Sequence, residues 1–208
     1  MTTTLYRNPP SSFRCQFSLP FTWAVKPRQD VMRGFRGAAL LTSLLIYVPP
    51  VQMTYIFVYG TLKKGQPNYF RMLPDQGNGK AEFCGHARTV DGYPLVIAGK
   101  YNIPYLLNRP GEGHRVQGEV YRVDDTMLSF LDAFEGCPTM YQRTSVQIEL
   151  EDWKVEGRER SPGSMMEAFF YSTTSYQPAW LKHNFYENYD AYGDHGLVYI
   201  DREDREIH

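Results

Sequence analysis

The sequence is poor in the residues that build disulfide frameworks and metal sites. Its three cysteines, Cys15, Cys84 and Cys137, form neither a CxxC motif nor a Cys/His pair at zinc-ligand spacing. Its five histidines are scattered, without an HxH or HExxH motif. We therefore expect free thiols in a reducing compartment, no metal and no cofactor.

Excess charge and long apolar runs are also missing. The chain has 22 Lys and Arg and 23 Asp and Glu, a net charge of −1, so it lacks the excess positive charge that nucleic-acid binding normally needs. The apolar run at residues 38–48 ends at Pro49-Pro50, whereas a membrane-spanning helix needs about 20 residues. We expect neither a nucleic-acid partner nor a membrane anchor.

The first 52 residues differ in composition from the rest. They contain six bases and one acid. We predict a leader over residues 1–52, either disordered or an alternative N-terminal extension, with Met53 as a second start. An Arg-rich, acid-poor segment is also typical of organelle transit peptides, so import stays open beside a cytoplasmic location. The remaining residues, 53–208, have the length of one globular domain.

The body of the chain alternates short strand patterns with turn residues. Residues 55–59 are β-branched and aromatic and end at Gly60, which indicates a buried strand and a tight turn. Asp91-Gly92 is expected to separate two further strands. Short strands at this spacing predict a compact sheet or small barrel. The further strands are expected at residues 81–89, 94–98, 105–107, 116–123, 146–150 and 168–171.

The clearest helix is predicted over residues 125–134. Asp124 is placed to cap its N-terminus, and Gly136 follows its C-terminus. A second, shorter helix is expected around residues 68–73. One face of the main helix is apolar, with Met127, Leu128, Leu131 and Phe134.

Glu135 directly follows this helix. A carboxylate at the negative end of a helix dipole is disfavoured by about 0.3–1 kcal/mol. Burial beside Phe134 and Tyr141 would remove hydration as well, and both effects raise the pKa of a carboxyl toward the range useful for general acid-base catalysis. The alternative is a solvated glutamate at a helix end, which the pattern alone favours.

Tyr59, Gly60, Thr61 and Leu62 form the sequence YGTL at the end of the first strand. A glycine where a buried strand breaks lets successive backbone N–H groups converge on an anion, and we expect a carboxylate as that ligand. A purely structural turn is the alternative. Because GTLKKG matches neither GxxxxGK[ST] nor GxGxxG, no nucleotide site is predicted.

Several segments together resemble the gamma-glutamylcyclotransferase-like superfamily. The similarity spans residues 55–199 and leaves the leader outside. NIP-x-LL, FE-x-CP-xx-YQR and HGL-x-Y are similar to the branch that acts on gamma-glutamylamines. The segments are FVYGTLKKGQPN at 57–68, YPLVIAGKYNIPYLL at 93–107, VQGEVYRVDD at 116–125, LDAFEGCPTMYQR at 131–143 and YDAYGDHGLVY at 189–199.

The resemblance implies an α+β fold for residues 53–208, a small mixed-sheet β-barrel with flanking helices and a cavity at its mouth. The YGTL residues would hold the glutamyl part of the substrate, and Glu135 would be the catalytic acid and base. Tyr141 would line the pocket or bond that carboxylate. The implied reaction releases an amine from a small gamma-glutamylamine: gamma-glutamyl-epsilon-lysine, left by digestion of transglutaminase-crosslinked proteins, gives 5-oxoproline and lysine. We expect a monomer.

Two alternatives remain open. The first is a cyclotransferase for gamma-glutamyl amino acids or glutathione, whose leaving amine carries a carboxylate near the bond that breaks. A spare Arg or Lys at the pocket rim would favour it, and Arg143 is the cation nearest the motif. The second is a non-catalytic module that binds a small ligand, although binding alone has no need of a carboxylate such as Glu135.

Overall fold

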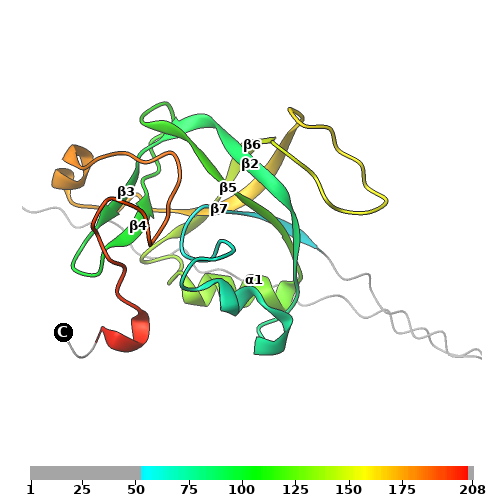
Figure 1. Cartoon of the computed structure of the whole chain (residues 1–208), viewed down its shortest axis with the longest axis horizontal. Coiled ribbons are helices and arrows are strands. Elements are labelled where there is room, and N and C mark those ends of the chain that lie inside the picture. The colour runs from blue at the N-terminus through cyan, green and yellow to red at the C-terminus, as the bar shows by residue number, and fades with distance from the viewer. Residues whose placement is uncertain (1–52, 206–208) are drawn as a thin grey trace, which may run out of the picture. The chain divides into compact units, whose positions relative to one another are not determined.

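The computed structural model describes residues 53–205, and the predicted leader lies outside this range (Figure 1). Five strands form a closed barrel in the order β1-β5-β2-β6-β7, and β3 and β4 pair as a separate two-stranded sheet. The barrel strands are β1 (Thr54–Val58), β2 (Ala81–Tyr93), β5 (His114–Val123), β6 (Gln142–Leu150) and β7 (Met165–Ser172). The small sheet consists of β3 (Leu95–Ala98) and β4 (Ile103–Leu106).

The barrel is a mixed sheet, as expected. β1 runs parallel to β7, with Ile56 opposite Phe169, and the other recorded neighbours are antiparallel. The predicted α+β fold is confirmed. Within the described residues one flanking helix is an α-helix, α1 (Asp125–Phe134), and four are short 3-10 helices. The 3-10 helices are η1 (Tyr69–Met72), η2 (Pro74–Gln76), η3 (Pro178–Lys182) and η4 (Arg202–Asp204).

The second half of β1, Ile56–Val58, is buried on both faces, which explains its unbroken apolar sequence. Phe57 belongs to the core inside the barrel, with Val120 and Phe170. Ile56 and Val58 belong to a second core on the other side of the strand. A strand covered on both faces has no polar face to alternate with its apolar one.

α1 covers the outer face of β1. Its buried Met127 and Leu131 share the second core with Ile56 and Val58, and the helix lies below the barrel in Figure 1. The helix has the predicted bounds. Its packing holds the C-terminal end of α1 near the end of β1.

Several strands begin before their predicted first residue, and one predicted separation of strands is wrong. Asp91-Gly92 was expected to separate two strands, but both residues lie inside β2. The register of β2 against β5 shifts between Arg88 and Gly92, so the turn-forming pair is accommodated by a bulge-like irregularity instead of a chain reversal. The short helix expected at residues 68–73 is the 3-10 helix η1.

The N-cap of α1 is a direct test of this architecture. The Oδ1 of Asp124 accepts hydrogen bonds from the Met127 N–H at 2.9 Å and the Lys80 N–H at 3.1 Å. We expect Asp124→Ala to lower the free energy of unfolding by about 1–2 kcal/mol in urea denaturation. The control Asp125→Ala, which removes a neighbouring charge with no recorded side-chain bond, should cost less than half as much. Equal losses would contradict the capping role.

Candidate active site

A cavity opens where β1 ends. The cavity is partly open to solvent. Its walls come from five parts of the chain: β1 with the YGTL loop, residues 103–104 of β4, the end of α1 with the segment after it, Tyr171 of β7, and the C-terminal residues. Concave sites lined by apolar side chains and a few polar groups suit small ligands.

The structure brings every sequence-predicted site residue to this one cavity. Tyr59, Gly60, Thr61 and Leu62 line one wall, and Glu135 and Tyr141 line another. These residues lie up to 82 positions apart in the sequence, so the barrel and α1 determine their proximity. Their catalytic and binding roles stay predictions.

Hydrogen bonds with the residues that follow it hold the YGTL loop in place. The Asn68 N–H donates to the Thr61 carbonyl at 2.9 Å, and the Lys63 N–H donates to the Gly60 carbonyl at 3.1 Å. The buried carboxylate of Glu119 accepts from the Lys64 N–H at 2.9 Å and from the Tyr121 hydroxyl at 2.8 Å. These bonds use the carbonyls of the loop and leave its first N–H groups uncommitted.

The uncommitted donors are the N–H groups of Gly60, Thr61 and Leu62. Among residues 53–205 none of the three donates a recorded hydrogen bond. A close approach favours glycine here, because a Cβ at position 60 would lie 3.2 Å from Cγ of Pro104 and the proline ring would have to shift. Adjacent backbone donors in a turn are suited to bind an anion or a developing oxyanion.

Glu135 is the C-terminal cap of α1. Its N–H donates to the Leu131 carbonyl at 2.9 Å, and its side chain lines the cavity. The residue is half-buried because it faces this opening, but the protein surrounds the carboxyl closely enough that burial raises its pKa to about 7. The charge of Arg202 opposes the rise, and no described residue forms an ion pair with Glu135.

Burial therefore dominates over the helix-end effect that the sequence suggested. Removing a carboxylate from water disfavours its charged form, and a pKa near 7 leaves both forms populated at neutral pH. Such a group can accept a proton in one step and return it in the next.

Two buried tyrosines, Tyr59 and Tyr141, line the cavity. The Tyr141 hydroxyl donates to the Pro104 carbonyl at 3.0 Å, and the Tyr59 hydroxyl donates to the Tyr171 carbonyl at 2.5 Å. Burial raises the pKa of both phenols well above the ordinary value, so both stay protonated. Tyr141 lines the cavity, and its recorded hydrogen bond is with Pro104 and not with Glu135.

Sequence reasoning missed the cations of the cavity. Arg143 pairs with Asp132 at 3.0 Å and does not line the cavity. Instead Arg202 and Arg205 line it, together with Tyr199. These arginines belong to the sequence DREDR, which has the composition of a solvated surface segment, so only the position of the family-like HGL-x-Y motif just before them offered a signal.

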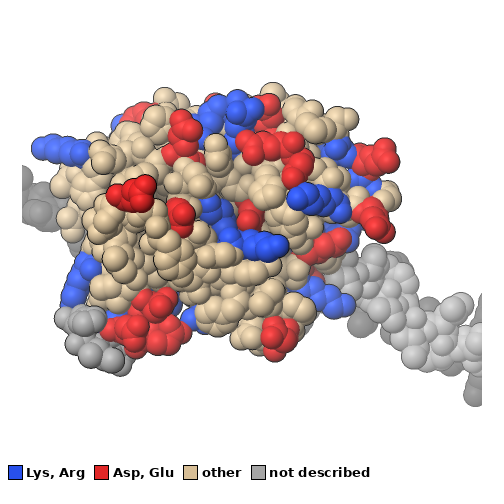
Figure 2. Space-filling model, in the orientation of Figure 1, with Lys and Arg blue, Asp and Glu red and all other residues tan. Residues whose placement is uncertain are grey.

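The remaining surface gives little indication of a large polyanionic partner. Acidic and basic side chains are interspersed over the face drawn in Figure 2. No helix within residues 53–205 has the length and hydropathy to cross a membrane. The same residues contain no group of three or more His, Cys, Asp or Glu side chains arranged to hold a metal ion.

Comparison with known proteins places this cavity in a family. The sequence profile of the family described as "Gamma-glutamyl cyclotransferase, AIG2-like" matches residues 56–191. The chain belongs to the AIG2-like gamma-glutamyl cyclotransferase family. The profile includes every sequence-predicted residue of the cavity and stops before Tyr199 and Arg202.

Individual family members are similar over the same region. The chain is 54% identical over 153 residues to the rat protein named gamma-glutamylaminecyclotransferase, which covers 74% of this chain and all of the rat protein. The human protein of that name is 48% identical over 154 residues, with the same coverage. The crystal structure of an AIG2-like protein from mouse superposes with a TM-score of 0.67 at 51% identity, covering 73% of this chain and 97% of the mouse chain.

The raised pKa of Glu135 predicts a pH-dependent stability difference. Because the folded-state pKa of about 7 exceeds the ordinary 4.5, the folded protein retains a proton that the unfolded chain releases, and stability falls as pH rises from about 4.5 to 7. Glu135→Gln lacks this titration. Its stability relative to the wild type should increase across this interval by about 1–3 kcal/mol and level off above pH 8.

Urea denaturation of both proteins from pH 4.5 to 8.5 measures this difference. A difference that stays constant with pH would mean that the Glu135 carboxyl is solvated and titrates normally.

Proposed function

We propose that this protein is a gamma-glutamylaminecyclotransferase. It converts gamma-glutamyl-epsilon-lysine to 5-oxoproline and free lysine, a step in degrading transglutaminase-crosslinked proteins. The observation that carries the proposal is the Glu135 carboxyl, with a pKa of about 7, in one cavity with the uncommitted N–H groups of Gly60, Thr61 and Leu62. The names of the rat and human relatives support the substrate class.

The substrate supplies its own nucleophile. Its α-amine attacks the γ-carbonyl carbon, a five-membered ring closes, and the bond from that carbon to the leaving nitrogen breaks. Holding the reacting atoms about 3–3.5 Å apart lowers the activation barrier by roughly 7–11 kcal/mol. The reaction therefore needs neither an activated water nor a metal-bound nucleophile.

Glu135 moves the protons. At pH 7 the α-amine of the substrate is mostly an ammonium group, with a pKa of about 8. Two of its three protons must leave as it becomes the ring N–H, and the departing nitrogen must gain two to leave as an ammonium ion. The ammonium group loses the first proton to solvent before the attack, Glu135 takes the second and gives it to the departing nitrogen, and the released amine regains a proton from solvent, so the reaction has no net proton uptake.

The N–H groups of the YGTL loop receive the negative charge of the substrate. We assign to them the α-carboxylate of the glutamyl group and the oxyanion that forms on the γ-carbonyl oxygen. Tyr59 and Tyr141 form apolar walls whose hydroxyls are already bonded to backbone carbonyls, so neither phenol competes for the proton on Glu135.

A second candidate function is cyclisation of gamma-glutamyl amino acids or glutathione. Arg202 and Arg205 favour it, because a guanidinium in the cavity can receive a carboxylate carried by the leaving amine. The difference between the two functions is the distance of that carboxylate from the bond that breaks. A non-catalytic binding module has no observation in its favour here.

Glu135→Gln separates catalysis from binding. The glutamine has nearly the same shape but cannot exchange protons, so we expect 5-oxoproline formation from gamma-glutamyl-epsilon-lysine to fall by 10²–10⁴-fold while substrate still binds. Mass spectrometry of 5-oxoproline gives the rate, and calorimetry gives the affinity. In the wild type, kcat/KM should rise with pH through about 7, as Glu135 ionises.

The matched control is Glu159→Gln, which makes the same change on an exposed loop and should retain full activity. Near-full activity of Glu135→Gln would refute the acid-base role. Glutathione or gamma-glutamyl-alanine as the best substrate would favour the second candidate function.

We further propose that the enzyme acts as a cytoplasmic monomer without a metal or cofactor, with import through residues 1–52 as the alternative location. Light scattering of the full chain tests whether the enzyme is a monomer, and activity in the presence of a chelator tests whether it needs a metal.

A further inference from the structure

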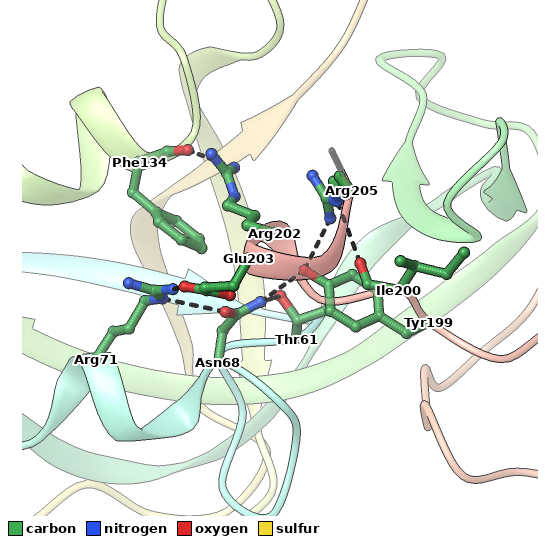
Figure 3. A network of polar contacts seen from close by, with 9 residues as sticks. All are labelled: Thr61, Asn68, Arg71, Phe134, Tyr199, Ile200, Arg202, Glu203 and Arg205. Atoms are coloured by element: carbon green, nitrogen blue, oxygen red, sulfur yellow. Dashed lines mark hydrogen bonds and ion pairs between the residues drawn. The ribbon is translucent and has the colours of Figure 1, made fainter. Parts of the chain in front are cut away.

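The last described residues, Tyr199–Arg205, run along the cavity and are here called the tail segment. Figure 3 shows how this segment contacts Thr61 of the YGTL loop. The side-chain amide of buried Asn68 donates one hydrogen bond to the Tyr199 hydroxyl at 2.8 Å and another to Oγ1 of Thr61 at 3.0 Å. One end of the tail segment is thus joined through a single side chain to the YGTL loop.

Two further contacts hold the other end of the tail segment. Arg71 pairs with Glu203 at 2.6 Å and also donates to Oδ1 of Asn68 at 3.1 Å. Arg202 donates through Nη2 to the Phe134 carbonyl at 2.6 Å, with its guanidinium 4.2 Å from the centre of the Phe134 ring. The tail segment therefore connects the YGTL loop to the end of α1 and forms a fixed wall of the cavity.

This wall carries the positive charge of the cavity. Among the residues that line it within 53–205, Arg202 and Arg205 are the cations and Glu135 is the anion. No ion pair joins either arginine to Glu135. In addition, Nε of Arg202 is buried and has no hydrogen-bond partner among the described residues. A buried donor of this kind is unfavourable until something accepts from it.

The chemistry of a guanidinium defines the missing acceptor. Its planar fork binds carboxylates better than neutral groups. Resting on the function proposed above, the glutamyl carboxylate is assigned to the YGTL loop, which leaves a carboxylate on the departing amine. Arg202 bonds the carbonyl of the residue just before Glu135, and Glu135 is the group that protonates this amine. The arginine therefore lies on the side where the leaving group departs.

We propose that the tail segment is the recognition site for the leaving group, and that Arg202 binds the carboxylate of the amino acid that is released. Arg205, which bonds the Tyr199 hydroxyl at 3.0 Å and the Ile200 carbonyl at 3.1 Å, adds a second positive charge to the same wall. Among gamma-glutamylamines, those whose leaving amine carries a free carboxylate, such as gamma-glutamyl-epsilon-lysine, are preferred, and simple alkylamine derivatives are poorer.

Two substrates that differ only at this carboxylate test the proposal: gamma-glutamyl-epsilon-lysine and the same compound with lysine as its carboxamide. For the wild type, kcat/KM should be about tenfold or more higher with the free carboxylate, mainly through KM, because charge-assisted bonds are the stronger ones. Arg202→Gln should reduce this preference to about twofold or less, because the rate with the carboxylate substrate falls further than any loss that both substrates share through the contact with Phe134. Arg202→Lys keeps the charge without the fork and should retain part of the preference.

Arg71→Gln is the control, because Arg71 fastens the tail segment but does not line the cavity. It should lower kcat/KM for both substrates alike and leave the preference unchanged. An equal loss for both substrates in Arg202→Gln would overturn the proposal, since Arg202 would then act through Glu135 or on the glutamyl group. A wild type without preference would also overturn it. A wild type that forms no 5-oxoproline from either substrate would refute the proposed function itself.

Discussion

The removal of one carboxyl group from water is the constraint on which the site depends. Glu135 follows the last turn of α1, where the helix has no free N–H donors to offer it, and no described cation pairs with it directly. Burial raises its pKa to about 7. In contact with bulk water the same side chain would stay ionised at neutral pH and would be a poor proton donor.

The fold maintains this constraint through packing remote from the chemistry. The second half of β1 is buried on both faces, with Phe57 inside the barrel and Ile56 and Val58 under α1. The helix end and the strand end therefore have a fixed separation. On the strand side, the buried Glu119 carboxylate holds the chain just after the YGTL loop. A reaction within one substrate molecule benefits from such rigidity, because its rate depends on the orientation of the reacting atoms.

Local signals in the sequence were sufficient where a contact is local. The Asp124 cap and the apolar face of the helix gave the bounds of α1 correctly, and the alternation of Val146, Ile148 and Leu150 located β6. Glu135 could be singled out because its position depends on the helix that precedes it. Asp91-Gly92 was misjudged because turn propensity is local, whereas pairing with β5 carries the strand through this point.

The contacts that sequence reasoning did not find are long-range. Asn68 and Tyr199 are 131 positions apart, and Arg202 reaches the helix end across 68 positions. No periodicity or spacing links such residues, and a charged segment near the C-terminus has the composition of a solvated surface. Only the closed barrel, which brings the tail segment back to the end of β1, shows that these side chains belong to the cavity.

The central claim is that the substrate cyclises on itself, and isotope labelling tests it most directly. The purified protein is incubated with gamma-glutamyl-epsilon-lysine in water enriched in ¹⁸O, and the products are weighed by mass spectrometry. Intramolecular attack predicts 5-oxoproline that contains no ¹⁸O, because no water oxygen enters the product. Glutamate with one ¹⁸O in its γ-carboxyl group, or labelled 5-oxoproline derived from it, would show that water is the nucleophile and would contradict the mechanism.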